Sequence, residues 1–371
     1  MNNIVYYVYM TSIFVLMFIF QLMMPKLTRK EIYFGVRIDG VEKENFNLDK
    51  IYKSFVKTNL LITLPYMVLI ILLFNKNFNE WIYSFGLIGM ILISTLLYYI
   101  AHKRVKKIKN ENNWTENKKQ VVIANISTIK DRKNKVLISA WWFIIPLIII
   151  LINIYLSLKQ YNVLPEKIPI HWDMSGNVNG WANKSYKTLL LMPITQMIMI
   201  IIMFLSYKSI GWAKRQISAT NPEQSLERDR IFRRATSAFI IGTSIIINLM
   251  FTFINLVVIQ MLTVSTKIML IVTLLPIILI LVIAIIISIK IGQGGSRIKL
   301  KKSSKENPTI INKNDDVYWK LGLFYVNKND SSIFVEKRFG IGYTLNFGRI
   351  ESYLIIGGIL ALILLSIFLS V

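Results

Sequence analysis

Apolar and charged residues are largely separated along this chain. Eight segments contain no Asp, Glu, Lys or Arg, and each is 18 residues or longer. About 20 apolar residues in a helix cross the hydrocarbon core of a bilayer, and lipid offers no partner for a backbone N–H or C=O. We therefore predict eight transmembrane helices, at Ile4–Pro25, Thr58–Asn75, Trp81–His102, Val136–Leu158, Thr188–Tyr207, Ala235–Thr266, Ile268–Ile289 and Ser352–Val371.

The gaps between these segments alternate between many and few basic residues. Four gaps hold 8, 11, 7 and 11 Lys and Arg residues, and the three gaps between them hold 1, 3 and 1. Lys and Arg near helix ends are retained on the cytoplasmic side of a membrane. The pattern predicts a multi-pass membrane protein with both termini and the loop Lys159–Lys187 on the outer side. The heavy use of Lys, Asn and Ile suggests a bacterial genome, so we expect the membrane to be a bacterial cytoplasmic membrane.

The predicted fold class is an all-α polytopic membrane protein with a small hairpin-like cytoplasmic segment before its last helix. Two β-prone runs, Leu321–Val326 and Ser332–Val335, are joined by the turn-forming sequence Asn327–Asp330 and are expected to pair. We divide the chain into three helices with basic loops (1–137), a helix–loop–helix unit (138–207), two further helices (208–291), a solvated basic linker (292–314), and the hairpin segment with the final helix (315–371).

Net charge changes the expected partners. The formal charge is +24, which in a soluble protein would suggest nucleic acid. Here the excess lies on the cytoplasmic side, where anionic lipid headgroups attract Lys and Arg, so the bilayer is the expected partner and nucleic acid is not. The chain has no cysteine, which excludes disulfides and thiol chemistry. We expect no cofactor and no metal.

The sixth predicted helix is the most polar. Its polar residues recur at helical spacing and share one face, and two interpretations stay open. They form hydrogen bonds between helices, or they line a cavity or conduit through which a permease or export component would act. The residues of this face are Ser237, Ser244, Asn248, Thr252 and Asn255.

The outer loop Lys159–Lys187 contains the residues most typical of an ordered surface. Two prolines favour extended backbone and two glycines favour tight turns, while two tryptophans suit the headgroup region. His171 beside Asp173 raises the question of catalysis, but a metal site needs three or four ligands and no nucleophile motif accompanies this histidine. We expect a hydrogen-bonded turn residue. The candidate residues of this loop are Pro165, Pro169, His171, Trp172, Gly176, Gly180, Trp181 and Lys184.

The same loop resembles a known family. It reads L-P-x-x-I-P-x-H-W-x-x-x-G-x-x-x-G-W-x-x-K from Leu164 to Lys184, similar to the signature of a bacterial domain of unknown function. That domain also forms the N-terminal part of the sporulation-delaying-toxin immunity proteins. The resemblance implies a membrane protein that gives immunity or resistance to a secreted toxic peptide, or that senses such a peptide or envelope stress.

A second resemblance lies in the cytoplasmic segment. The pattern is W-x-x-G-x-F-Y-x-N-x-x-D followed by V-x-x-R-x-G-x-G-x-T-x-N-F, and it is similar to another bacterial domain of unknown function, often joined to the first. The resemblance brings no known chemistry, and both capping of the inner face and docking of a partner stay open. The residues that we single out are Trp319, Gly322, Tyr325, Arg338, Gly340, Gly342 and Asn346.

The resemblance therefore favours a non-enzymatic membrane protein that gives immunity or resistance to a toxic peptide, or that senses such a peptide or envelope stress, with a secreted peptide toxin as its expected partner. The alternative is a permease or export component that uses the polar sixth helix. A membrane-embedded enzyme is a third hypothesis, and no acid pair, metal cluster or nucleophile motif in the sequence supports it.

Overall fold

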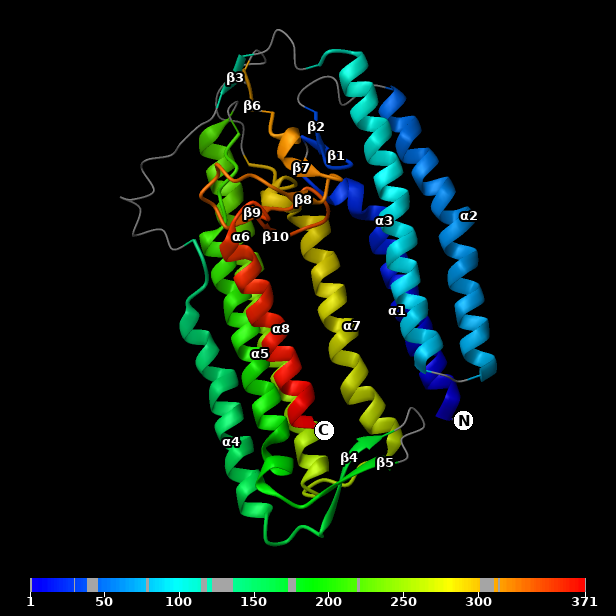
Figure 1. Ribbon diagram of the computed structural model, residues 1–371, viewed down its shortest axis with the longest axis vertical. Helices are drawn as coiled ribbons and strands as arrows, with labels where there is room; N and C mark the ends of the chain where they lie inside the picture. The colour runs from blue at the N-terminus through cyan, green and yellow to red at the C-terminus, as the bar shows by residue number, and fades with distance from the viewer. Residues whose placement is uncertain are drawn as a thin grey trace.

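The chain folds into a bundle of long helices with two-stranded sheets at both ends (Figure 1). The computed structural model describes residues 2–29, 31–38, 46–77, 80–114, 119–121, 136–172, 178–218, 221–300, 310–312 and 314–370. The long helices in these ranges are α1 (Asn2–Leu27), α2 (Phe46–Asn77), α3 (Glu80–Glu111), α4 (Ile144–Gln160), α5 (Tyr186–Trp212), α6 (Pro222–Val258), α7 (Thr266–Lys290) and α8 (Ile350–Ser370).

Six of these helices, α2 to α7, are long and apolar enough to cross a membrane. They indicate a multi-pass membrane protein. In α1 and α8 the apolar stretches found among the described residues are shorter, at Thr11–Leu27 and Ile350–Leu365. The structure thus places a helix in every segment where a span was predicted, while the count of eight crossings stays a prediction.

Several helix ends differ from the sequence prediction, among them the start of α2, which lies at Phe46 rather than Thr58. The sixth helix spans Pro222–Val258, whereas the predicted span was Ala235–Thr266, and α3 continues beyond His102 to the end of Glu80–Glu111. A charge-free run ends at the first basic residue, but a helix continues wherever its apolar face is still covered. Val105 and Phe232 lie in these charged extensions and are fully buried, so packing carries both helices beyond the apolar spans.

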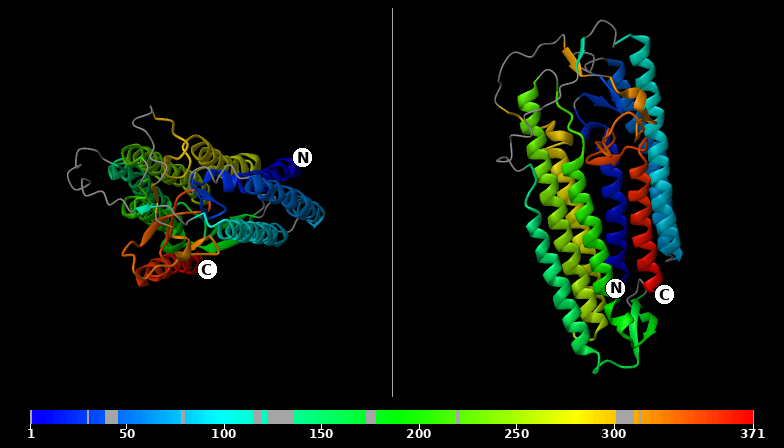
Figure 2. Two further views of the ribbon diagram at one scale, coloured as in Figure 1. Left: turned by 90° about the horizontal axis from the view of Figure 1, so that it is seen from above. Right: turned by 60° about the vertical axis from the view of Figure 1, so that its left-hand side comes forward.

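Two groups of helices make up the bundle (Figures 1 and 2). Helices α1, α2 and α3 share a core that includes Phe14 and Met90, and α4, α5 and α6 share another that includes Ile150 and Ile241. Helix α7 contacts both α6 and α1, and α8 packs on α5. Helix α7 therefore connects the two groups within the membrane.

The sheets lie at opposite ends of the bundle. Strands β4 (Lys167–Trp172) and β5 (Val178–Asn183) form a hairpin at the end toward which both termini point (Figure 1), which we call the hairpin end. The other end, the basic end, carries strands supplied by the gaps rich in Lys and Arg. These pair as β1 (Ile32–Tyr33) with β2 (Val36–Arg37), β3 (Lys119–Val121) with β6 (Ile310–Asn312), β7 (Trp319–Lys320) with β8 (Phe324–Tyr325), and β9 (Phe334–Glu336) with β10 (Tyr343–Leu345).

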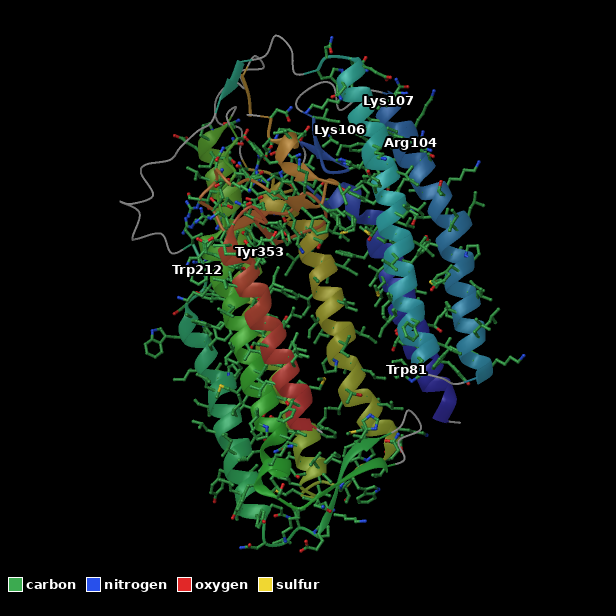
Figure 3. All side chains as sticks on the ribbon, viewed as in Figure 1. Trp81, Arg104, Lys106, Lys107, Trp212 and Tyr353 are labelled. Atoms are coloured by element: carbon green, nitrogen blue, oxygen red, sulfur yellow. The ribbon has the colours of Figure 1, made fainter. Side chains whose placement is uncertain are left out.

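Exposed aromatic residues lie at two levels of the bundle. Figure 3 shows Trp81 toward the hairpin end and Trp212 with Tyr353 toward the basic end, and all three are exposed. Arg104 lies farther toward the tip of the basic end, as do Lys106 and Lys107 (Figure 3). Trp81 and Arg104 are separated by about 35 Å of helix. Aromatic residues at two levels, with basic residues beyond one of them, are typical of a membrane-spanning bundle.

The predicted cytoplasmic hairpin is wrong in its strand pairing. Leu321–Val326 was expected to pair with Ser332–Val335, but β7 pairs with β8, and β9 pairs with β10. Leu321 and Gly322 both have left-handed φ angles, +56° and +70°, so a tight turn interrupts the predicted first strand. Each predicted strand then pairs with a neighbour on its other side.

The predicted linker 292–314 is also wrong at its start. Gln293, Gly294 and Gly295 form a short 3-10 helix, η4 (Gln293–Gly295), and all three are buried rather than solvated. The side-chain amide of Gln293 makes two hydrogen bonds to the backbone of Gly342. Its Oε1 accepts from the Gly342 N–H at 2.7 Å, and its Nε2 donates to the Gly342 carbonyl at 3.0 Å. Residues 301–309 and 313 of this linker lie outside the described residues.

Candidate functional site

The loop Lys159–Lys187, predicted to lie on the outer side, is built as a β-hairpin. In its antiparallel register Ile168 pairs with Ala182, Pro169 with Trp181, and His171 with Gly180. Sequence reasoning predicted turns here but no strands. Burial alternates along β5 with the two-residue period of a strand, but the sequence hides this period because Trp181 occupies an exposed position.

Apolar residues anchor this hairpin to the bundle. Leu164 and Ile168 are buried against Leu189 of α5 and against Val258 and Ile259 at the end of α6. Pro165 lies in the turn between Leu164 and β4. This small core fixes the base of the hairpin to two helices, so the strands project from a rigid support.

Lys184 closes the base of the hairpin. Its Nζ donates to the Leu164 carbonyl at 2.9 Å, and its backbone N–H donates to the Glu166 carbonyl at 2.8 Å. The ammonium also lies 5.2 Å from the ring centroid of Tyr161, which stacks on Tyr186 at 4.3 Å. The side chain therefore acts as a structural clamp between the two ends of the loop.

His171 is exposed, and its Nδ1 is hydrogen-bonded to Asn179 Oδ1 across the hairpin. Gly180 is required opposite it, because a Cβ there would lie 2.7 Å from the His171 Cβ. Within the described residues no group of three or more His, Cys, Asp or Glu side chains could hold a metal ion. These contacts are those of a hydrogen-bonded hairpin residue. Gly176, also predicted for this loop, lies outside the described residues together with Asp173.

The hairpin end presents exposed aromatic and apolar side chains. Trp181 is 57% exposed, Tyr186 is 58% exposed, and Val163 is 74% exposed. We call these three residues the outer aromatic surface. Trp172 is only partly buried and packs on the apolar anchor. Tyrosine and tryptophan on a rigid support are the residues that most often dominate binding energies at interfaces.

The polar face of α6 is packed between α4 and α5. Ser244, Asn248 and Asn255 are almost completely buried. Asn255 Nδ2 donates to Ser157 Oγ of α4 at 3.1 Å, and the carbonyl of Asn248 accepts from Gln196 of α5 at 2.9 Å. These contacts match the interhelical interpretation.

Sequence reasoning missed the partners of this face. Asn153, Ser157 and Gln196 are isolated polar residues in the middle of apolar spans, and all three are completely buried. A polar side chain at the centre of a membrane helix usually faces the bundle interior, and this is the signal that could have identified them.

A buried ionic cluster holds the basic end together. The Nε and Nη2 atoms of Arg29, just after α1, each donate to a different oxygen of Glu336 in β9 at 2.7 Å. Gln293 Nε2 donates to the same carboxylate at 3.2 Å. Both partners of the ion pair are buried. This bidentate salt bridge joins two residues that are 307 positions apart in the sequence.

Arg338 is the centre of a second part of the cluster. It donates to Asp315, to Asp316 and, at 2.9 Å, to the carbonyl of Gly35, and it lies over the Trp319 ring. Further cations reach the same two carboxylates: Arg37 Nε lies 3.1 Å from Asp315, and Lys109 Nζ lies 2.6 Å from Asp316. The segment after α1, the end of α3 and the segment before α8 are thereby joined.

Asn346 organises the predicted turn Asn327–Asp330. Its Nδ2 donates to the carbonyls of Asn327, Asp330 and Ser332, and its Oδ1 accepts from the Asn327 N–H at 3.0 Å. Tyr325 donates its hydroxyl proton to Asp330 at 2.9 Å. The turn was predicted correctly, and this amide is what fixes its shape.

The predicted glycines of the cytoplasmic motif occupy backbone positions that other residues rarely adopt. Gly322, Gly340 and Gly342 have φ angles of +70°, +72° and +108°. A Cβ at Gly322 would also lie 2.6 Å from Nδ1 of His102, which is bonded to the Phe34 carbonyl at 2.7 Å. His102 therefore serves as a packing and hydrogen-bonding residue of the basic end.

Two carboxylates of the cluster, Asp315 and Asp316, have lowered pKa values. Burial alone would raise the pKa of Asp315, but Arg338 and Arg37 beside it lower that pKa to about 2. The pKa of Asp316 is lowered for the same reason, since Arg338 and Lys109 outweigh the effect of burial. Both groups stay ionised to well below neutral pH.

We expect acid to weaken the basic end. A carboxylate with a folded-state pKa of about 2 and an unfolded pKa of about 3.9 stabilises the fold above about pH 4, and loses that contribution as the pH falls toward 2. For Asp315 the loss amounts to about 2–3 kcal/mol. Measurements of the free energy of unfolding in detergent, made from pH 6 to pH 2, test this loss. Asp315→Asn is the control, and its stability should fall less steeply; parallel curves for the two proteins would contradict the prediction.

Two segments of the chain match families of unknown function. Residues 148–197, which contain the hairpin and parts of α4 and α5, match a family described as Domain of unknown function (DUF1648). Residues 328–353, which contain β9, β10 and the start of α8, match one described as Family of unknown function (DUF5808). The two predicted resemblances to domains of unknown function are confirmed in this sense. The relation to toxin-immunity proteins stays a prediction.

Comparison of the chain with curated proteins gave no match, and comparison with solved structures gave none either.

Proposed function

We propose that the protein is a non-enzymatic bacterial membrane protein that confers resistance to a toxic peptide, or that senses such a peptide or envelope stress. The observation that carries this proposal is the outer aromatic surface. Its hairpin is fixed by a buried anchor to α5 and α6, and it lies in the segment that matches the first family. A peptide that reaches the cell envelope from outside would meet Trp181 and Tyr186 first.

The proposed topology has eight membrane crossings, with both termini and the hairpin outside. Its support is the placement of the basic gaps at the end opposite the hairpin (Figure 1) and the two levels of aromatic residues (Figure 3). An even number of crossings puts the two termini on the same side, and both lie toward the hairpin end (Figure 1). Anionic lipid headgroups would then contact the basic end.

Binding rather than catalysis fits the chemistry of the hairpin. His171 uses Nδ1 for a bond to Asn179 within the hairpin. A peptide that is apolar on one face would bury the exposed rings of the outer aromatic surface on binding, and burial of apolar area is the dominant favourable term in such association.

The test is a deletion strain challenged with a panel of secreted killing peptides. Survival should fall for at least one peptide, and expression of the wild-type chain should restore it. Trp181→Ala should fail to restore survival at equal expression. Trp81→Ala is the matched control, because Trp81 is also exposed (70%) at the same end of the bundle but lies outside the hairpin, and it should restore survival fully. Unchanged survival of the deletion strain across the whole panel would overturn the proposal.

A further inference from the structure

Three side chains at the centre of the polar network between α4, α5 and α6 use all of their hydrogen-bond donors. Asn153 Nδ2 donates to Gln196 Oε1 at 2.9 Å and to Thr252 Oγ1 at 2.8 Å. Gln196 Nε2 donates to the Asn248 carbonyl at 2.9 Å and to Thr252 Oγ1 at 3.2 Å. The Thr252 hydroxyl donates to the Asn248 carbonyl at 2.8 Å. No hydrogen on these three side chains remains available.

Acceptors, in contrast, are left over. Within the described part of the chain, Oδ1 of Asn153, of Asn248 and of Asn255 has no hydrogen-bond partner in the protein, and the buried hydroxyl of Ser244 has none either. Asn153 and Asn255 are 0% exposed and Asn248 is 1% exposed. A buried acceptor without a partner costs about 1–3 kcal/mol, and the surrounding lipid offers no donor. The arrangement therefore calls for a donor from outside the protein.

Two of these acceptors lie on one face of α6, because Asn248 and Asn255 are seven residues apart in that helix. Asn255 is about 10 Å from Asn248 along the helix, so the unpaired acceptors extend over about two turns.

We propose that ordered water molecules bind in this seam between α4, α5 and α6. They donate hydrogen bonds to Oδ1 of Asn153 and Asn248 and, farther toward the hairpin end, to Oδ1 of Asn255. Buried waters make about three hydrogen bonds to polar groups that are otherwise unpaired. An ion is the weaker candidate, because the predicted spans that contain these residues carry no Asp, Glu, Lys or Arg and a buried charge needs a counter-charge.

The chain offers a matched pair of residues for the test. Asn248 Nδ2 donates to the carbonyl of Ser244, four residues earlier, at 2.9 Å. Asn59 of α2 is also completely buried and donates to the carbonyl of Phe55, again four residues earlier, at 2.8 Å. The Oδ1 of Asn59, however, accepts from protein groups, namely Gln21 Nε2 at 2.6 Å and Thr63 Oγ1 at 3.1 Å. The two asparagines therefore differ in one respect: protein groups donate to Oδ1 of Asn59, and no protein group donates to Oδ1 of Asn248.

The direction in which the melting midpoint of Asn248→Leu changes shows whether Oδ1 of Asn248 accepts a hydrogen bond in the wild type. If water donates to its Oδ1, Asn248→Leu should lower the midpoint of thermal unfolding by about 2–4 °C, as Asn59→Leu should. If Oδ1 has no donor, leucine removes an unpaired polar atom and the midpoint should stay the same or rise. A lowered midpoint for Asn59→Leu together with an unchanged or raised one for Asn248→Leu would overturn the proposal.

Two further measurements distinguish bound water from acceptors that are left unpaired and from a bound ion. A cryo-EM map in lipid nanodiscs that resolves water elsewhere should show density within about 3 Å of Oδ1 of Asn153 and Asn248; a map without it would overturn the proposal. The wild-type melting midpoint should be equal in NaCl, KCl and choline chloride at one ionic strength. A rise specific to sodium or potassium that Asn248→Leu abolishes would overturn the proposal in favour of a bound cation.

Discussion

Replacing Glu336 by alanine should lower the free energy of unfolding by about 3–5 kcal/mol, because it leaves the buried guanidinium of Arg29 without its counter-charge. Two hydrogen bonds of 2.7 Å join these side chains, and their exposures are 8% and 1%. The pKa of Arg29 is raised although burial acts to lower it, since Glu336 stabilises the charged form. Gln293 would lose one of its bonds as well. Equilibrium unfolding in mixed micelles measures the change.

The control for this variant is an exposed ion pair of the same protein. Asp49→Ala breaks the contact between Asp49 and Lys53, whose side chains are 70% and 74% exposed. Exposed pairs four residues apart on a helix contribute only about 0.3–0.5 kcal/mol. If Glu336→Ala proved no more costly than Asp49→Ala, the Arg29–Glu336 bridge would not hold the basic end together.

Replacing Gly295 by alanine should cost about 3 kcal/mol or more. Gly295 has a φ of +74°, and a Cβ there would lie 2.3 Å from the backbone oxygen of Arg228. A left-handed conformation strains any residue with a side chain, and this neighbour is a helix backbone that cannot rotate away. The same unfolding experiment and the yield of folded protein in detergent measure the effect.

Gly357 in α8 provides the comparison. A Cβ there would meet nothing within 4 Å, and alanine in a helix is favoured over glycine by about 0.5–1 kcal/mol. Gly357→Ala should therefore be as stable as the wild type or slightly more stable. Wild-type stability of Gly295→Ala would contradict the close contact between η4 and α6.

The positions of the helices could be predicted because the membrane acts on every residue of a span in the same way. A run without charges is a local property of the sequence, and each predicted run is helical over most of its length. The ends of α3 and α6 could not be predicted from that rule. Buried residues such as Val105 and Phe232 extend both helices into the charged gaps, and which neighbour covers them is a tertiary property.

The prediction of strand pairing failed for a related reason. The turn Asn327–Asp330 was recognised, but the left-handed backbone at Leu321 was not, because leucine gives no sign of it. The loop Lys159–Lys187 was identified by its residues while its strands were missed. Its two prolines favoured extended backbone, but a proline cannot donate to a strand ladder, so Pro169 in β4 gave no sign of pairing.

Contacts between residues that are distant in the sequence could not be predicted from local sequence patterns. The polar face of α6 was recognisable from its spacing, yet its partners Asn153 and Gln196 come from two other helices. Arg29 and Glu336 are 307 residues apart, and nothing in the sequence around either one indicates the other. Candidate residues were thus easier to predict than the contacts that give them a role.

Labelling of single cysteines tests the central claim, that the hairpin lies outside the cell and the ionic cluster inside. The chain has no cysteine, so Asn183→Cys in β5 and Asn329→Cys beside β8, both at exposed positions, can each be introduced alone. A membrane-impermeant maleimide applied to intact cells should label Asn183→Cys, and should label Asn329→Cys only after permeabilisation. Labelling of Asn329→Cys in intact cells, with Asn183→Cys protected, would contradict the topology and the proposed function with it.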